Sequence, residues 1–511
     1  MRNRTFTFVG CLVMSTACGG SSSDDVADTT AGDGASMDGS AGDGGDGADG
    51  GGDGTDATAG SGGTDDGADS GSDDGSDGPT GGDPPGVCGQ VATFEDGAAP
   101  TSEIHVATDG NDAGGCGAAE APCASLSGAA TQAGPGSAIV VHAGTYAGGA
   151  WLEGLAGTQD APIWIGGAEG EPSPRFEGDL VAFTLRRPAY VIVHDLEIAN
   201  TTANGINVDD GSDYDNESAA HHVVFRNLTI HDIGEGGNND CLKLSGLNDF
   251  FVLHNDMSGC GGGLAGSGID HVGCHRGVVA YNWFHDMAES GNAVQTKGGS
   301  EDIEIRANRF DNAGSRALNL GGSTDFEYFR PPLGAGDNAE ARNIRAIANV
   351  IVGSDAAVAF VGCVDCLAAN NTIVDPVRWT IRILQETQSG GGFTFLPARD
   401  GTFVNNVVYF QRAGFSTNLN VGEATAPETF SFATNLWFAH DDPGQSDPSG
   451  ELSSPESGGI YGQDPGFVDD EFRIDGSSPA AGAGTALAEV GGDMGGDCYG
   501  QPPAIGAWSP E

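Results

Sequence analysis

An asparagine recurs at a nearly regular interval through the second half of the chain, each time between short apolar runs. The asparagines of this repeat are Asn227, Asn255, Asn282, Asn308, Asn349, Asn370 with Asn371, Asn405 with Asn406, and Asn435. The closest successive copies are 22 to 28 residues apart. A period of this length holds one supersecondary unit per repeat, so the pattern predicts a solenoid.

The repeating units are predicted to be strands. Short β-rich runs, such as 223–225 and 278–280, are broken by Gly, Asn and Asp, and no stretch keeps a helical period for three turns. Coils stacked at about 4.8 Å place each Asn above the next, where the side-chain amides can form a hydrogen-bonded ladder. We therefore expect an all-β fold, a single-stranded right-handed parallel β-helix of roughly ten coils.

The N-terminus carries an export signal. Arg2 and Arg4 precede a short apolar run over 6–14, and small residues then lead to Cys18. Residues 1–18 resemble a bacterial lipoprotein signal, which implies that Cys18 becomes lipidated, although Ser15 stands where Leu is usual. Plain secretion is the alternative. We expect an exported outer-membrane lipoprotein, at the cell surface or in the periplasm, that touches the membrane only through its lipid anchor.

Residues 19–86 form a region of their own. They consist almost wholly of Gly, Asp, Ser, Thr and Ala, with seventeen Asp and no Lys or Arg. Such a segment cannot bury enough apolar surface to offset the entropy of ordering, so it is predicted to be a disordered tether. The β-helix domain is then residues 87–511, which we expect to be monomeric.

Charge and cysteine content limit the partners and the compartment. The net charge of −53 excludes nucleic acid as a partner, because an acidic surface repels phosphates. Eleven Cys fit an exported protein. We expect disulfides between Cys116 and Cys123 and between Cys363 and Cys366.

Both ends of the repeat region resemble those of a known superfamily. Residues 104–112 and 139–146 resemble the opening coil of pectin-lyase-like β-helix proteins, and 464–468, 478–480 and 505–507 resemble their closing segment. The resemblance spans roughly residues 100–508 and implies the fold. It implies little about chemistry, because many activities share this scaffold.

The candidate site lies on one outward face of the coils. Alternation along five predicted strands sends two rows of side chains to solvent. The first row is Asn207, Lys243, Asp270, Gln295 and Asn319, and the second is Asp209, Ser245, Val272, Lys297 and Gly321. The two Lys of the chain both fall in these rows, with Asp270 on the coil between them. A surface charge ladder worth at most about 1 kcal/mol is the alternative interpretation.

One local resemblance implies a lyase. Residues 293–297 resemble the strand that carries the catalytic Lys in the chondroitinase B and alginate lyase family, which implies that Lys297, or Lys243, acts as a base. Arg316 or Arg382 would then bind the substrate carboxylate. The sequence has Ser290 and Asn292 where that family places calcium-binding Glu, so calcium is optional in this interpretation.

A second local resemblance is to polygalacturonases. Residues 204–206, 239–242 and Cys260 resemble the turns that carry the hydrolytic Asp residues of that family. Asn204 and Asn239 stand where Asp is expected, which leaves Asp240 alone. A single carboxylate cannot perform the two-carboxylate mechanism, so hydrolysis is the less favoured reaction.

Loops beside this face supply further candidates. Phe326, Tyr328 and Arg330 lie in an insertion over 324–332, and a second aromatic insertion covers 392–397. These side chains are expected to contact sugar rings, or else to pack onto the solenoid. The acidic loop that holds Asp209, Asp213, Asp215 and Glu217 offers oxygens to Ca²⁺, with a solvated loop as the alternative.

These observations lead to one functional hypothesis with an alternative. The domain is expected to engage an extracellular polysaccharide along the face of Lys243, Asp270 and Lys297, with Gln295, Asn319 and Arg382 as further contacts. As an enzyme it would cleave uronic-acid-containing glycan by β-elimination. The alternative is a noncatalytic glycan-binding or cell-surface structural protein.

Overall fold

The computed structural model describes residues 88–234, 236–263 and 266–511. The predicted signal 1–18 with Cys18 and the predicted tether 19–86 lie outside the described residues. No helix within the described ranges has the length and apolar character needed to cross a membrane.

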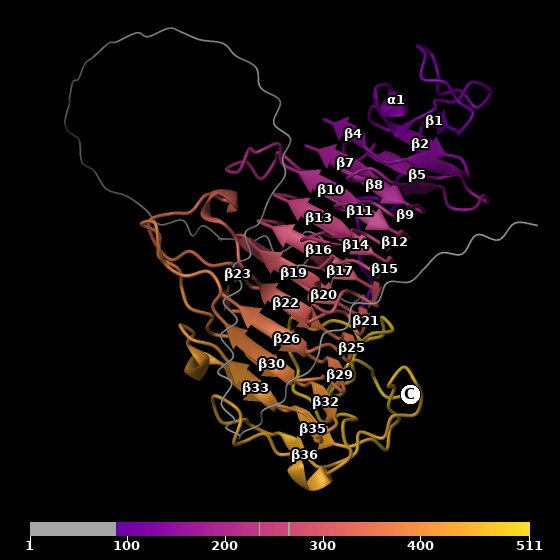
Figure 1. Ribbon diagram of the computed structural model, residues 1–511. Coiled ribbons are helices and arrows are strands. Elements are labelled where there is room, and N and C mark those ends of the chain that lie inside the picture. Colours follow the sequence, from indigo (N-terminus) through magenta and orange to yellow (C-terminus); the bar gives the residue numbers. More distant parts are fainter. Residues whose placement is uncertain (1–87, 235, 264–265) are drawn as a thin grey trace, which may run out of the picture. The chain divides into compact units, whose positions relative to one another are not determined.

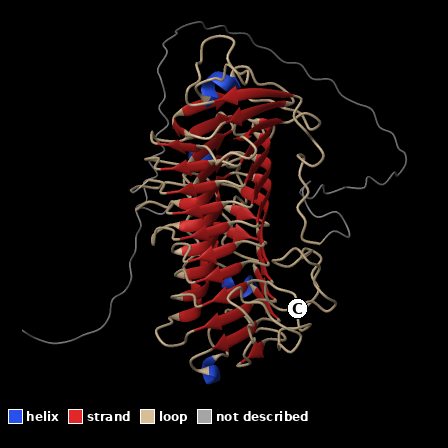
Figure 2. Cartoon of the chain, turned by 90° about the vertical axis from the view of Figure 1, so that its right-hand side faces the viewer, coloured by secondary structure: helices blue, strands red, loops and turns tan. Residues whose placement is uncertain are grey.

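Three parallel sheets run along the described domain (Figures 1 and 2). Sheet 1 contains β1 (Ser102–Val106), β2 (Ser137–Val141), β5 (Ile163–Gly167), β8 (Ala189–His194), β11 (His221–Arg226), β14 (Asn248–Leu253), β17 (His275–Ala280), β20 (Ser300–Arg306), β24 (Arg345–Ile347), β28 (Leu367–Ala369), β31 (Thr402–Val404) and β34 (Ser431–Ala433), with β23 (Ala341–Arg342) and β27 (Cys363–Val364) at its side.

Sheet 2 contains β4 (Ala150–Glu153), β7 (Phe183–Arg186), β10 (Ile206–Asp209), β13 (Leu242–Ser245), β16 (Ser267–Val272), β19 (Asn292–Lys297), β22 (Arg316–Gly321), β26 (Ala356–Val361), β30 (Trp379–Leu384) and β33 (Thr417–Val421). Sheet 3 contains β3 (Thr145–Ala147), β6 (Arg175–Glu177), β9 (Glu197–Ala199), β12 (Thr229–His231), β15 (Asp256–Ser258), β18 (Trp283–His285), β21 (Arg309–Asp311), β25 (Val350–Val352), β29 (Thr372–Val374), β32 (Val407–Phe410), β35 (Leu436–Ala439) and β36 (Ile460–Tyr461). The helical elements are α1 (Leu126–Ala130), η1 (Phe326–Tyr328), η2 (Pro427–Thr429) and η3 (Pro443–Gln445).

Successive coils add one strand to each sheet, and each strand pairs in parallel with its equivalent in the next coil. The ten strands of sheet 2 agree with the expected number of coils. The prediction of an all-β, right-handed parallel β-helix is confirmed. Inward-facing residues fill the coils as stacked rows; Phe284 and Phe310, for example, lie with ring centroids 5.0 Å apart. Burial of these rows is the main source of stability, because each coil covers the apolar face of its neighbour.

The predicted asparagine ladder is present from Asn255 onward. The amide Nδ2 of each ladder residue donates to Oδ1 of the next, over 2.8–3.1 Å, through Asn255, Asn282, Asn308, Asn349, Asn371, Asn406 and Asn435. The residue before each ladder Asn has a positive φ, as at His254 and Tyr281. This left-handed residue turns the chain from sheet 1 into sheet 3.

Asn227 does not belong to the ladder, and its inclusion in the predicted repeat was one residue out of register. It is itself the left-handed corner residue of its coil, with φ 55°. The buried Leu228 takes the ladder position there, and its backbone N–H donates to Asn255 Oδ1 over 2.9 Å. Asn tolerates the left-handed region better than most residues, so the same residue type serves both positions.

Four disulfides tie the described domain together. The predicted bonds Cys116–Cys123 and Cys363–Cys366 are present. Two further bonds, Cys241–Cys260 and Cys88–Cys498, were not predicted. Among the described cysteines, the buried Cys274 is free.

Candidate functional site

The outward rows on sheet 2 have the predicted register. Asn207 pairs with Lys243, Lys243 with Asp270, Asp270 with Gln295, and Gln295 with Asn319. Beyond Asn319 the same row continues through Ala359, Arg382 and Asn420. The predicted first row is therefore one continuous line of side chains along sheet 2.

The second row ends earlier than predicted. Asp209, Ser245, Val272 and Lys297 are aligned as expected. A register shift between Gln295 and Thr296 then pairs Gly321 with Thr296 rather than with Lys297. The placement of Gly321 beside Lys297 was wrong, because a bulge shifts the alternation by one residue.

The two lysines meet at one buried carboxylate. Lys243 Nζ donates to Asp270 Oδ2, and Lys297 Nζ lies 3.4 Å from the same oxygen. Asp270 is fully buried, whereas the lysine side chains expose 17% and 11% of their surface. The ammonium groups therefore lie closer together than the two-coil separation of their strands. The cluster carries a local excess of positive charge.

Burial alone would raise the pKa of Asp270. The ammonium groups of Lys243 and Lys297, with hydrogen bonds from Lys243 and Gln295, outweigh burial and hold the pKa of Asp270 well below its usual range. Asp270 is therefore an anion at neutral pH.

Asp240 is a second buried carboxyl beside the cluster. Its Oδ2 lies 3.7 Å from Lys243 Nζ, and its Oδ1 accepts a hydrogen bond of 2.7 Å from the Ser267 backbone. Burial raises the pKa of Asp240 to about 7, and the Asp270 carboxylate adds to the rise while the lysines oppose it. Sequence reasoning noted Asp240 but did not place it in the site.

Amide and guanidinium groups extend the cluster along the sheet. Gln295 Nε2 donates to Asp270 Oδ1 over 3.1 Å, and Asn319 Nδ2 donates to Gln295 Oε1 over 2.8 Å. Arg316 Nη1 donates to Asn319 Oδ1 over 3.0 Å, and its Nη2 pairs with Glu386 at 2.7 Å. The buried Gln295 and Asn319 are therefore connectors beneath the surface, while Lys243, Lys297 and Arg316 carry the charge.

Arg382 extends the row two coils beyond Asn319. Its Nε donates to Asn420 Oδ1 over 3.0 Å, and its Cζ lies 4.1 Å from the ring centroid of Trp379. Arg378 contacts the same ring, with its Cζ 4.0 Å from the centroid. Burial, and next the charge of Arg316, lower the pKa of Arg382 to about 10.

The two predicted insertions pack on each other. Phe326 lies 5.6 Å from Phe393 and from Phe395, measured between ring centroids. The carboxylate of the buried Glu340 connects the segments from which the insertions start. It accepts hydrogen bonds from the backbone N–H groups of Gly298 and Thr324 and from the Thr387 hydroxyl. Glu340 was missed in the sequence, because its partners are far apart along the chain.

Arg330 lies at the ends of the strands that carry the lysines, where its backbone N–H donates to the carbonyl of Gly298 over 3.0 Å. Its Nε pairs with the buried Asp210 at 2.8 Å, and its guanidinium lies over the ring of Tyr214. Arg330 is itself buried, and its Nη1 donates to the backbone carbonyl of Tyr328. These contacts connect the 324–332 insertion to the 210–217 loop, and they occupy the Arg330 guanidinium with partners from the protein itself.

The acidic residues of the predicted calcium loop face different partners. Asp209 Oδ1 lies 3.4 Å from Arg186 Nε, and Glu217 Oε2 lies 2.9 Å from Arg276 Nη1. Asp213 accepts a hydrogen bond from Asn216, and with Asp215 and Glu217 it lines a small hollow that also contains His275. Calcium binding by this loop stays a prediction.

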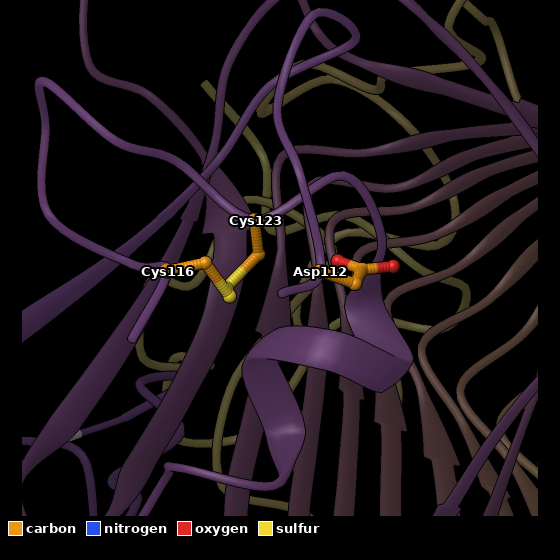
Figure 3. Close-up of side chains that lie close together, drawn as sticks. All are labelled: Asp112, Cys116 and Cys123. Carbon is orange, nitrogen blue, oxygen red and sulfur yellow. A yellow bond between two sulfur atoms is a disulfide. The ribbon is translucent and has the colours of Figure 1, made fainter. Parts of the chain in front are cut away.

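Within the described residues, a single group of three metal-ligand side chains converges: Asp112, Cys116 and Cys123 (Figure 3). The two sulfur atoms are joined in a disulfide and offer no thiolate. Asp112 instead accepts hydrogen bonds from the Ala124 and Ser125 backbones at the start of α1. This group is a structural cap on the first coil.

Comparison with known proteins adds solved structures of low similarity. No protein-family model and no curated relative matches the chain. The pectate lyase Pel9A is 16% identical, with a TM-score of 0.49, over 81% of this chain and 98% of that chain. XylC, solved with xylose, is 11% identical, with a TM-score of 0.47, and the match covers 80% of this chain and 98% of XylC. An alginate lyase from Paenibacillus sp. str. FPU-7 is 17% identical, with a TM-score of 0.38, and the match covers 59% of this chain and 96% of the lyase.

Proposed function

We propose that the β-helix binds an acidic polysaccharide along the outer face of sheet 2, with Lys243 and Lys297 directed at sugar carboxylates. One observation carries the proposal: the two lysines of the chain, from separate coils, meet at the single carboxylate of Asp270. Two ammonium groups on the Asp270 carboxylate leave a positive charge when the second acid of the cluster, Asp240, 3.7 Å from Lys243, is protonated. In an otherwise acidic protein, such a charge forms a local binding point for an anion.

The geometry favours a polymer over a small ligand. The charged and amide row continues in register over successive strands of sheet 2, each about 4.8 Å from the next. Two hollows of the described domain lie elsewhere: one is lined by Asp210 and Arg330 and the other by Gln385 and Phe395, and neither includes Lys243 or Lys297. An extended chain lying along an open face suits this arrangement better than a ligand enclosed in a pocket.

Binding to uronate polymers and to a neutral polymer, measured by affinity electrophoresis, tests the proposal. Lys243→Met and Lys297→Met should each weaken uronate binding. Arg175→Met is the matched control, because it removes one ion-paired cation from sheet 3. Equal loss in the control, or equal binding of the neutral polymer, would count against the proposal.

Cleavage by β-elimination is the second candidate. It is favoured by the partial exposure of Lys243 and Lys297, at 17% and 11%, with the buried Asp240 3.7 Å from Lys243 as a group that can exchange a proton with that lysine. In this reaction Lys297 or Lys243 is the base, or the lysines neutralise the substrate carboxylate. Arg316 is the arginine placed to assist at that carboxylate, because Arg382 lies three strands beyond Lys297. Calcium is optional. A rise in ultraviolet absorbance from unsaturated uronate, lost in Lys297→Ala or Lys243→Ala, would establish it. If the absorbance does not rise while the polysaccharide is still bound, the noncatalytic binding function stands.

We further propose that the domain is exported and anchored through Cys18. The four disulfides support an oxidising compartment outside the cytoplasm. Metabolic labelling with a radioactive fatty acid should mark the wild-type protein but not Cys18→Ala. Equal labelling of both proteins would refute the anchor.

A further inference from the structure

Arg382 differs from the other cations on the strands of sheet 2. Those strands carry five Lys or Arg residues, and four of them lie within ion-pair distance of a carboxylate: Arg186, Lys243, Lys297 and Arg316. Across the described ranges, no carboxylate lies within 4.0 Å of the Arg382 guanidinium. Arg382 therefore has no carboxylate in contact with its guanidinium, and Glu386 and Asp355 act on its charge only from a longer distance.

The guanidinium of Arg382 is held in a fixed orientation. Trp379 lies under it at 4.1 Å, and Asn420 accepts from Nε at 3.0 Å. Arg378 places a second guanidinium 4.0 Å from the same indole ring, and Arg378 reaches Asp355 only at 4.0 Å. Within the described chain, the two Nη groups of Arg382 donate no hydrogen bond. A planar donor pair with no partner, on a rigid support, suits bidentate binding of a planar or tetrahedral anion.

Arg382 also stands in line with the lysine cluster. It belongs to the same outward row as Asp270, and its strand β30 lies three strands beyond β19, which carries Lys297. Three strand spacings correspond to about 14 Å along sheet 2. Between these cations the row contains Asn319 and Ala359, which are uncharged and buried.

We propose that Arg382 and Arg378, held by Trp379, form a second binding site for an anionic group of the same glycan. This inference rests on the proposed function and narrows its substrate class. A ligand that reaches both sites must carry negative groups repeatedly along its length, as a carboxylate or as a sulfate. A glycan with one isolated uronate would reach the lysine cluster alone.

Affinity as a function of ligand length tests the second site. Calorimetric titration would use a dimeric and a hexameric oligogalacturonide and a sulfated oligosaccharide of hexamer length. Arg382→Gln should weaken binding of the long anionic ligands by about tenfold, the usual scale for one charge-assisted contact, and should leave the dimer unchanged. Arg382→Lys should lose less affinity than Arg382→Gln, because Lys keeps the positive charge but lacks the planar pair of donors of the guanidinium. A larger effect on the uronate or on the sulfated ligand identifies the group that is bound.

Control variants separate this inference from the proposed function. Arg473→Gln removes an arginine that pairs with Asp469 in the C-terminal segment, and it should change no affinity. If Arg382→Gln binds the long ligands like the wild type while Lys243→Met weakens them, the second site is refuted and the proposed function stands. If Arg382→Gln weakens binding and both lysine variants do not, the lysine cluster is refuted instead. A wild-type protein that binds no anionic ligand overturns both. A thermal unfolding curve for each variant confirms that it is folded.

Discussion

Glu456 ends the asparagine ladder by accepting from Asn435. Its Oε1 lies 2.8 Å from Asn435 Nδ2 and 3.0 Å from the Asn435 backbone N. Every ladder amide donates to the Asn of the next coil. Asn435 is the last Asn of the ladder, so its amide needs another acceptor, and a group that only accepts hydrogen bonds leaves no new donor without a partner. An ionised carboxylate meets this requirement. Glu456 Oε2 also accepts from the Trp437 indole and the Tyr461 hydroxyl, which fixes the carboxylate at the final coil.

Removing one amide from the middle of the ladder should destabilise the fold. In Asn308→Ala, the Asn282 side chain and backbone N–H both lose the Oδ1 acceptor, and the Val279 carbonyl loses its donor. Buried groups left without partners cost about 1–3 kcal/mol each, so we expect a loss of at least about 2 kcal/mol in urea denaturation. Asn227→Ala, at the exposed corner outside the ladder, should cost about 1 kcal/mol, mainly from its left-handed backbone. Equal losses would show that the ladder adds no stability of its own.

Much of the fold and part of the site follow from sequence pattern. The strand period of two fixes which side chains face outward, and the repeat fixes which strands are neighbours. The contact of Lys243 and Lys297 with Asp270 could therefore be predicted from the alignment of three strands. The ladder could be predicted for the same reason, apart from Asn227, where the repeat does not distinguish a corner residue from its neighbour.

Other features have no local pattern from which to predict them. The bulge after Gln295 moved Gly321 out of the second row, and nothing in the alternation marks it. Glu386 pairs with Arg316 from 70 residues away, across an insertion whose path depends on tertiary packing. The disulfide between Cys88 and Cys498 joins residues 410 positions apart, for which no spacing rule exists.

Asp270→Asn should strongly destabilise the protein, because Lys297 and Lys243 would lose the carboxylate between them and only Asp240, 3.7 Å from Lys243, would remain. Removing one partner from a buried ion pair costs about 3–5 kcal/mol. Replacing all three residues, as Lys243→Met, Asp270→Leu and Lys297→Met together, should recover most of that loss. Urea denaturation of the single and triple variants measures both values. A triple variant no more stable than Asp270→Asn would mean that packing, and not charge, sets the cost.

Asp240 should give the stability a distinctive pH dependence. Its pKa of about 7 in the folded protein lies above the value of about 3.9 in an unfolded chain. Between these values the native state holds a proton that the unfolded state has released, so stability falls as pH rises through this window, with a slope of up to about 1.4 kcal/mol per pH unit. Asp240→Asn should remove this contribution, which is read as the difference between the wild-type and variant unfolding free energies from pH 5 to pH 8. Asp270, whose pKa is lowered, acts in the opposite sense and loses its contribution as the pH falls below about 4. His271, whose pKa burial lowers to about 4, acts in the opposite sense to Asp240 over the same range, so the test is the difference between the wild-type and Asp240→Asn profiles. A difference that does not fall between pH 5 and pH 7 would contradict the burial of a neutral Asp240.

The bond between Cys88 and Cys498 should contribute more stability than any other disulfide of the domain. It closes the longest loop, and the entropy removed from the unfolded chain grows with loop length. The segment after Cys88 also packs on the outer face of sheet 1, where Glu95 pairs with Arg226 at 2.6 Å and the Phe94 ring lies 5.4 Å from Tyr190. We expect the double variant Cys88→Ser and Cys498→Ser to lose up to about 6 kcal/mol in denaturant unfolding, the value that loop entropy gives for a loop of this length.

The matched control is the double variant of Cys116 and Cys123, which are seven positions apart and should cost only about 2.5 kcal/mol. Hydrogen exchange adds a local measurement to the same comparison. Without the bond to Cys498, amides near Phe94 should exchange faster, because the segment would then be held only by its contacts with sheet 1. Amides in the middle of the asparagine ladder should keep their protection relative to global unfolding. Equal losses in the two double variants would show that loop length does not decide the stabilisation, and that the segment is held by its packing.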